Sequence, residues 1–163
     1  MWIRKFVSLM LLFIFGYFVN AQAIERQQAM NWCWVSSVQD VVAQAGIYES
    51  QSQVATRLVG WPQNRPATIN ELVWLIQSYG LRAWQAGRPG SPQELYNTLM
   101  SGWKLIAFVR PTNGPVGHYI VLEGIDYYGN IIVSDPATGY TFLNIPQQLY
   151  TNWHWSDSVV VGR

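Results

Sequence analysis

The spacing of apolar residues predicts a helical first part of the chain. From Trp34 to Ala45 apolar residues recur every three or four positions and Gly46 follows, so a helix is predicted over residues 32–45. Three further helices are predicted from capping motifs, which begin at Ser50, Thr68 and Ser91. The last of these helices ends near Ser101, and a short strand is expected over residues 81–84.

After Lys104 the apolar spacing changes from about 3.6 to 2, which is typical of strands. The predicted strands cover residues 105–109, 118–125, 131–134, 140–143 and 158–161. A hairpin turn is expected around Tyr128-Gly129, and residues 146–151 can form one more helical turn. Helices followed by an antiparallel sheet predict an α+β fold, with a helical half and a sheet half.

The N-terminal segment has the features of a secretion signal. Arg4 and Lys5 precede a 14-residue apolar stretch over residues 6–19, and Ala21-Gln22-Ala23 supplies small residues for cleavage. We therefore expect a signal peptide over residues 1–23 and one domain over residues 24–163, with cleavage after Ala21 or Ala23. An uncleaved anchor is the weaker interpretation, because 14 helical residues rise about 21 Å, less than the roughly 30 Å of a bilayer core.

Composition narrows the function classes. Half of the residues are hydrophobic and 12% are charged, which excludes a disordered chain. Without the signal segment, the chain contains 8 Lys and Arg and 9 Asp and Glu, so it has no excess of positive charge. We therefore expect no nucleic-acid partner. Cys33 is the only cysteine, and no disulfide can form within the chain.

Cys33 is the candidate nucleophile. It lies at the predicted start of the first helix, where the positive end of the helix dipole favours a thiolate. The alternative is that Cys33 is a small buried side chain without a chemical role. Gln27, six residues earlier, is close enough in the chain for its amide to join the Cys33 N–H at a developing oxyanion, although a glutamine alone has little weight.

A thiolate nucleophile needs a base, and two histidines follow the signal segment. His118 is the better candidate, because it begins an apolar strand directly after the glycine-rich residues 113–117. His154 lies between two tryptophans in a segment without a matching partner. It is the fallback candidate.

Asp135 is the candidate for orienting the imidazole. A hairpin loop of two or four residues places Asp135 opposite Leu122, on the face of His118 but about 13 Å along the strand. Strong twist, a bulge or bending must then bring the two side chains together. The alternative role of Asp135 is turn formation in Ser134-Asp135-Pro136.

These motifs together resemble the papain-like cysteine proteases. Gln27 with Cys33-Trp34, then Gly117-His118, then Ser134-Asp135-Pro136 are similar in order and interval to compact bacterial members, both secreted avirulence-effector proteases and peptidases that cleave double-glycine leaders. The resemblance implies Cys33 as nucleophile, His118 as base, Asp135 as orienting residue and Gln27 as oxyanion residue. It implies no cofactor and no metal. Plant-type members have asparagine at the position of Asp135.

The sequence therefore predicts a secreted or periplasmic cysteine endopeptidase that acts on a peptide or protein. A thiol amidase or acyltransferase would use the same residues on another acyl group. A catalytically inactive binding or inhibitory module remains a third alternative. The pattern leaves the substrate and the oligomeric state open.

Overall fold

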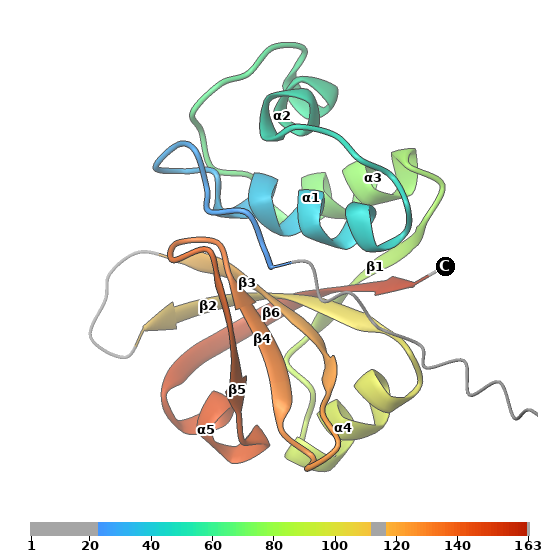
Figure 1. Cartoon of the computed structure of the whole chain (residues 1–163), viewed down its shortest axis with the longest axis vertical. Helices are drawn as coiled ribbons and strands as arrows, with labels where there is room; N and C mark the ends of the chain where they lie inside the picture. The colour runs from blue at the N-terminus through green and yellow to red at the C-terminus, as the bar shows by residue number, and fades with distance from the viewer. Residues whose placement is uncertain (1–22, 112–116, 163) are drawn as a thin grey trace, which may run out of the picture.

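The computed structural model describes residues 23–111 and 117–162 (Figure 1). The predicted signal peptide lies outside the described residues except for Ala23. The helices are α1 (Cys33–Gln44), α2 (Gln51–Val59), α3 (Ile69–Ser78), α4 (Pro92–Met100) and α5 (Pro146–Thr151). The strands are β1 (Arg82–Gly87), β2 (Lys104–Pro111), β3 (His118–Ile125), β4 (Ile131–Asp135), β5 (Tyr140–Asn144) and β6 (Trp153–Gly162). Within the described ranges, no helix has the length and apolar character needed to cross a membrane.

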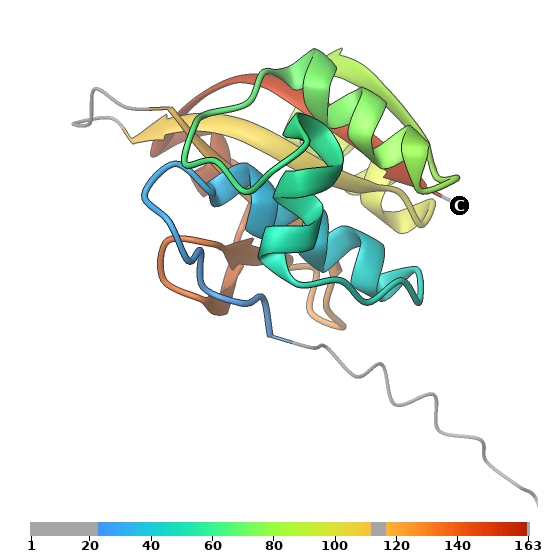
Figure 2. The same cartoon turned by 90° about the horizontal axis from the view of Figure 1, so that it is seen from above.

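One antiparallel sheet of six strands, in the order β1-β6-β2-β3-β4-β5, separates two groups of helices. Helices α1, α2 and α3 lie above the sheet in Figure 1, and α4 and α5 lie below it. Figure 2 shows the first group from above, with α2 and α3 in front of the strands. Each face of the sheet has its own apolar core, one against α1 to α3 and one against α4 and α5. The predicted α+β fold is confirmed.

The predicted capping motifs form as expected. The hydroxyl of Ser50 accepts from the N–H of Gln53, and the hydroxyl of Thr68 accepts from the N–H of Glu71, each within a complete capping box. Ser91 caps α4, which has a proline in its first turn. Helix α1 differs, because its N-cap residue Trp32 makes no side-chain cap.

The structure extends β1, β2 and β6 by three or more residues beyond the ranges that the apolar pattern indicates. β1 continues to Gly87 and β6 begins at Trp153, and these two strands pair with each other from Arg82↔Gly162 to Gly87↔Asp157. Polar residues interrupt the alternation there, and the side chain of Gln85 donates to Asp157 across the ladder at 3.1 Å. Such polar pairs stabilise strands without leaving an apolar signal.

The β3–β4 hairpin corrects the predicted loop length. The N–H of Asp126 donates to the carbonyl of Asn130 at 2.9 Å, which leaves a loop of three residues that ends at Gly129 with φ +84°. The register also shifts between Leu122 and Gly124, and this bulge at Glu123 pairs Leu122 with Val133 and not with Asp135. Asp135 is thereby two residues nearer to His118 than predicted.

The side chain of Glu123 connects this bulge to α1. Its carboxylate binds Lys104 Nζ at 3.0 Å and accepts from Gln44 Nε2 at 2.6 Å, and the Gln44 amide also donates to Asp40 at 2.9 Å. Asp40 is 6% exposed and lies close enough to Glu123 for the two carboxyl groups to share a proton. Glu123 Oε1 is buried and has no hydrogen-bond partner among the described residues. Burial, and then the hydrogen bond and negative charge of Glu123, raise the pKa of Asp40 to about 9.

We expect the proton on Asp40 to make stability depend on pH. A carboxyl with a raised native pKa binds more protons folded than unfolded, so its contribution to stability is complete below about pH 4 and is lost as the pH rises through about 9. Asp40→Asn removes this term and keeps a donor for Glu123. In urea titrations, the free energy of unfolding of Asp40→Asn minus that of the wild type should increase by about 1–3 kcal/mol from pH 5 to pH 9.5.

The control for this experiment is Asp157→Asn, which removes a carboxylate that takes no part in the contacts of Asp40 and Glu123. A parallel pH dependence of the wild type and Asp40→Asn would contradict the shared proton.

Candidate active site

One cleft lies between the start of α1 and the ends of β2 and β3. It has a volume of about 460 Å³. Three of the predicted site residues line it: Gln27, Cys33 and His118. Its apolar walls come from both halves of the molecule and include Trp34, Phe108 and Tyr119.

Cys33 is the first residue of α1 and is partly exposed. The first N–H groups of a helix have no partner within the helix. No capping side chain occupies them in α1, and the first intrahelical bond runs from the N–H of Ser36 to the carbonyl of Trp32. The N–H of Cys33 is therefore available to an oxygen that approaches the sulfur.

His118 contacts the two other predicted members of the site. Its Nε2 lies 2.7 Å from Oδ1 of Asp135, and the Cys33 thiol lies close enough to raise the pKa of the imidazole. The side chains of His118 and Asp135 are 17% and 15% exposed. Oδ1 of Asp135 also accepts from the N–H of Ala137 at 2.9 Å, which fixes the carboxylate. The structure thus brings together the cysteine, the histidine and the aspartate that the sequence indicated.

The surroundings of His118 favour its protonated form. Burial lowers the pKa of His118, but the hydrogen bonds to Asp135 and Cys33 and the negative charges of both raise it to about 9. For Asp135, burial raises the pKa, but the hydrogen bonds from His118 and Ala137 hold it below its usual value. At neutral pH the site therefore contains a cationic imidazole between two acidic groups.

Gln27 lies in the cleft but its amide is already engaged. Nε2 donates to the carbonyl oxygens of Ala29 and Met30 at 2.9 and 2.7 Å. The backbone N–H of Gln27 donates to the carbonyl of Pro136 at 2.9 Å, which ties this segment to the turn after Asp135. Donation by Gln27 to an oxyanion would require it to give up one of the two amide bonds.

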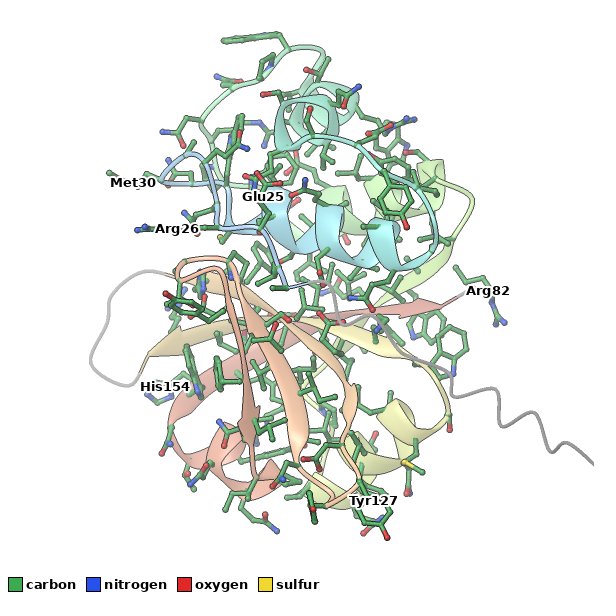
Figure 3. The ribbon with its side chains drawn as sticks, viewed as in Figure 1. Glu25, Arg26, Met30, Arg82, Tyr127 and His154 are labelled. Carbon is green, nitrogen blue, oxygen red and sulfur yellow. The ribbon has the colours of Figure 1, made fainter. Side chains whose placement is uncertain are left out.

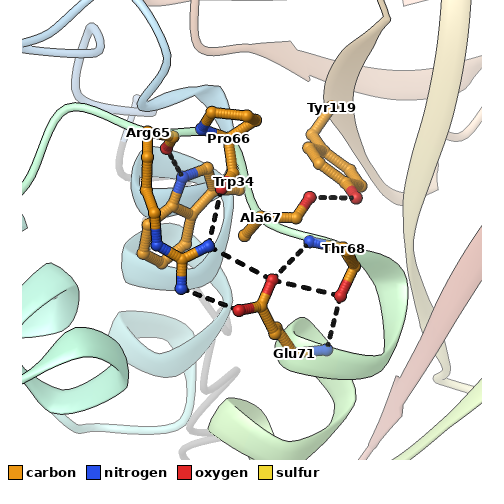
Figure 4. A network of polar contacts seen from close by, with 7 residues as sticks. All are labelled: Trp34, Arg65, Pro66, Ala67, Thr68, Glu71 and Tyr119. Atoms are coloured by element: carbon orange, nitrogen blue, oxygen red, sulfur yellow. Dashed lines mark hydrogen bonds and ion pairs between the residues drawn. The ribbon is translucent and has the colours of Figure 1, made fainter.

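The segment between α2 and α3 forms a fixed wall of the cleft through Pro66 and Ala67 (Figure 4). The indole N–H of Trp34 donates to Arg65 O at 2.8 Å, and the hydroxyl of Tyr119 donates to Ala67 O at 2.9 Å. The wall is therefore held by the helix that carries Cys33 and by the strand that carries His118.

Phe108 is a cleft residue that the sequence analysis did not identify. A Cβ on Gly117 would lie 2.1 Å from Cζ of Phe108, so the ring is pressed against the residue before His118. The centroid of the Phe108 ring lies 4.9 Å from the centroid of the Tyr119 ring. The alternation along residues 105–109 could have placed Phe108 on the same face as Ile106, but nothing in it marks a cleft.

His154, the fallback base, is not in this cleft. It lies on β6 opposite Arg110 of β2 and lines a separate depression. The structure therefore does not bring His154 to Cys33.

A thiol at a helix start, facing an imidazole and a carboxylate from two strands of an antiparallel sheet, defines the class of papain-like cysteine proteases. The sequence comparison agrees with this class. The chain belongs to the Peptidase_C39 like family, whose model matches residues 19–157. It is accordingly a cysteine peptidase. A comparison with curated protein sequences found no match.

Solved structures with a similar fold are peptidase domains. The peptidase domain of Streptococcus ComA, a bifunctional ABC transporter involved in a quorum-sensing pathway, has a TM-score of 0.64 and 15% identity, with 85% of this chain and 96% of that chain covered. A double glycine motif protease from an AMS/PCAT transporter, in complex with the leader peptide, has a TM-score of 0.62 and 14% identity over 85% of this chain and 89% of that chain.

A third similar structure is the N-terminal peptidase C39 like domain of a toxin secretion ATP-binding protein from Vibrio parahaemolyticus. Its TM-score is 0.54 at 16% identity, and 83% of this chain and 99% of that chain are covered. At these identities the three structures support the fold.

Asp135→Asn should lower the pKa of His118, because it removes a negative charge and weakens a hydrogen bond that stabilises the imidazolium. In the wild type, His118 loses its proton as the pH rises through about 9. In the variant, His118 should lose its proton at a pH lower by about one unit or more. The titration is measured by NMR of the imidazole carbon resonances.

Asp157→Asn again serves as the matched loss of a carboxylate from the sheet. An unchanged His118 titration in Asp135→Asn would show that the contact with Asp135 does not control the imidazole.

Proposed function

We propose that this protein is a secreted cysteine endopeptidase that uses Cys33, His118 and Asp135, with Gln27 assisting at the oxyanion. The observation that carries the proposal is that His118 shares one cleft with Cys33 and hydrogen-bonds Asp135 at 2.7 Å. A structural histidine would not need two acidic partners and a place in an open cleft.

The proposed reaction follows from the protonation of the site. The Cys33 sulfur, as thiolate, attacks the carbonyl carbon of a peptide bond, and the N–H of Cys33 stabilises the oxyanion. His118 then gives its proton to the leaving amine, and the bond to nitrogen breaks. Water hydrolyses the thioester with His118 as base. This restores the thiolate and imidazolium.

The residues around Cys33 favour a peptide as substrate. The cleft is open to solvent and has apolar walls, as expected for a site that holds side chains beside a backbone. One similar structure is a double glycine motif protease with its leader peptide bound, and by likeness this chain would bind an extended peptide.

The secretion signal is the basis for the proposed export. Residues 4–23 combine a basic start, an apolar stretch and small residues before the cleavage point. Mass spectrometry of the protein recovered outside the cytosol should find a chain that begins at Gln22 or Ile24. A chain that retains Met1 in that fraction would contradict cleavage.

The main test is covalent labelling by a peptidyl vinyl sulfone followed by mapping of the modified residue. We expect Cys33 to be labelled in the wild type, and labelling to be at least about 10²-fold slower in His118→Ala, since one positioned acid or base contributes about 10²–10⁴ in rate. Arg82→Gln, a remote surface variant, is the control and should label at the wild-type rate. Slow labelling of the wild type would favour an inactive binding module.

Labelling does not separate a peptidase from an amidase, so turnover is measured on peptide libraries and on cell-wall fragments. Cleavage of internal peptide bonds is the expected outcome. Activity confined to the fragments would overturn the endopeptidase proposal and keep Cys33 as nucleophile.

Gln27→Ala should show a graded loss. Removal of one oxyanion donor costs about 10²–10³ in kcat, and the N–H of Cys33 remains as the second donor. Cys33 in this variant should still react with iodoacetamide, because alkylation forms no oxyanion. If kcat on a cleaved peptide stays within a few-fold of wild type, Gln27 serves only its bonds to Ala29 and Met30.

A further inference from the structure

Two arginines without a carboxylate partner meet beside the catalytic cleft. Three other cations bind carboxylates: Arg57 binds Glu49, Arg65 binds Glu71 and Lys104 binds Glu123. Arg88 and Arg110 form no ion pair within the described part of the chain, yet both line one depression of about 380 Å³ together with His154. Among the residues that the structure describes, no acidic one lines that depression. Three groups that can bind an anion therefore line one depression. Glu94 acts electrostatically on Tyr150 but is not part of this lining.

The sheet register places this depression next to the catalytic histidine. Val109 of β2 pairs with His118 on one side and with Trp155 on the other. The next residue of β2 is Arg110, and it pairs with His154. Two strand spacings separate β3 from β6, which is about 10 Å, the length of three extended residues. A peptide with its reactive carbonyl at Cys33 can thus reach Arg110 and His154 within a few residues.

The walls of the depression are held in place before any ligand binds. The guanidinium of Arg88 lies 4.9 Å from the ring centroid of Tyr150, and that ring lies 5.8 Å from the ring of Trp155. The Tyr150 hydroxyl is 2.9 Å from the carbonyl oxygens of both Pro89 and Ser91. An ordered arginine loses less entropy when it binds an anion, so the stacked Arg88 favours binding.

The free edge of β6 adds backbone donors to this depression. β1 pairs with β6 only from Asp157 onward, so the residues from Trp153 to Ser156 have β2 on one side and no strand on the other among the described residues. An unpaired strand edge exposes N–H groups that can bind an extended peptide or a carboxylate.

We propose that this depression is a substrate subsite that binds a carboxylate of the peptide, through Arg110 and His154 with Arg88 at the far wall. The inference rests on the proposed peptidase function, because it takes the ligand to be the chain held at Cys33. Guanidinium groups match carboxylates in planar paired geometry. The carboxylate can belong to a Glu or Asp side chain or to the C-terminus of the peptide, and the chemistry of recognition is the same.

The test measures peptide binding to the full chain carrying Cys33→Ala, so that hydrolysis is not required. Peptides differ by a single Glu or Gln, placed two to four residues on either side of a common centre, and a further pair differs by a free or an amidated C-terminus. At one position, or at the C-terminus, the charged peptide should bind about 5- to 20-fold more tightly at low salt, and less so at high salt. The position that responds identifies the source of the carboxylate.

Substitutions in the depression then assign the preference. In the Cys33→Ala background, Arg110→Gln should reduce the ratio of affinities for the charged and uncharged peptides to about 1. Arg110→Glu should make the site prefer a peptide with Lys at the same position. The matched control is Arg82→Gln, because Arg82 has no carboxylate partner either and lies at the opposite end of β6 from His154, as the labelled side chains in Figure 3 show. This control should keep the full Glu preference.

The outcomes separate this inference from the proposed function. Cleavage by the wild type without any Glu preference, or a preference that persists in Arg110→Gln, overturns the subsite and leaves the peptidase intact. A Glu preference that depends on Arg110, in a protein whose Cys33 is not labelled and which cleaves no peptide, overturns the peptidase and leaves the binding site. Equal binding of every pair overturns the subsite as well.

Discussion

The contact between His118 and Asp135 depends on two irregularities in one hairpin. A regular two-residue turn would leave the carboxylate four residues along the ladder from the imidazole. The three-residue loop and the bulge at Glu123 each shift the register by one position, and the carboxylate then lies 2.7 Å from the ring. The raised pKa of His118 follows from that proximity. Without these shifts the imidazole would be a buried base with only the thiol beside it.

The same bulge joins the two halves of the molecule. It directs Glu123 toward α1, where Asp40 and Gln44 lie at the opposite end of the helix from Cys33. At the other end, the N–H of Gln27 donates to the carbonyl of Pro136, the residue directly after Asp135. Helix α1 is thus tied to the β3–β4 hairpin both before its start and near its finish. These polar links complement the apolar core and limit how far the sulfur can move relative to the ring.

Much of this arrangement follows from local sequence signals. Capping residues such as Ser50 and Thr68 define helix starts because they satisfy free N–H groups close in the chain. Cys33 and His118 could be proposed because each begins an element. The bulge at Glu123 and the start of β6 at Trp153 had no such signal, since they depend on pairing with strands distant in sequence. The engaged amide of Gln27 and the cleft position of Phe108 likewise depend on packing between segments.

The single cysteine has a consequence for the chain as a whole. Since Cys33 is the only thiol and takes part in the site, no cross-link supports the fold. The folded state therefore does not depend on the redox potential of its surroundings, whereas the chemistry of the site does. Oxidants can silence the sulfur and reductants can restore it after reversible oxidation, while the sheet and both cores stay assembled.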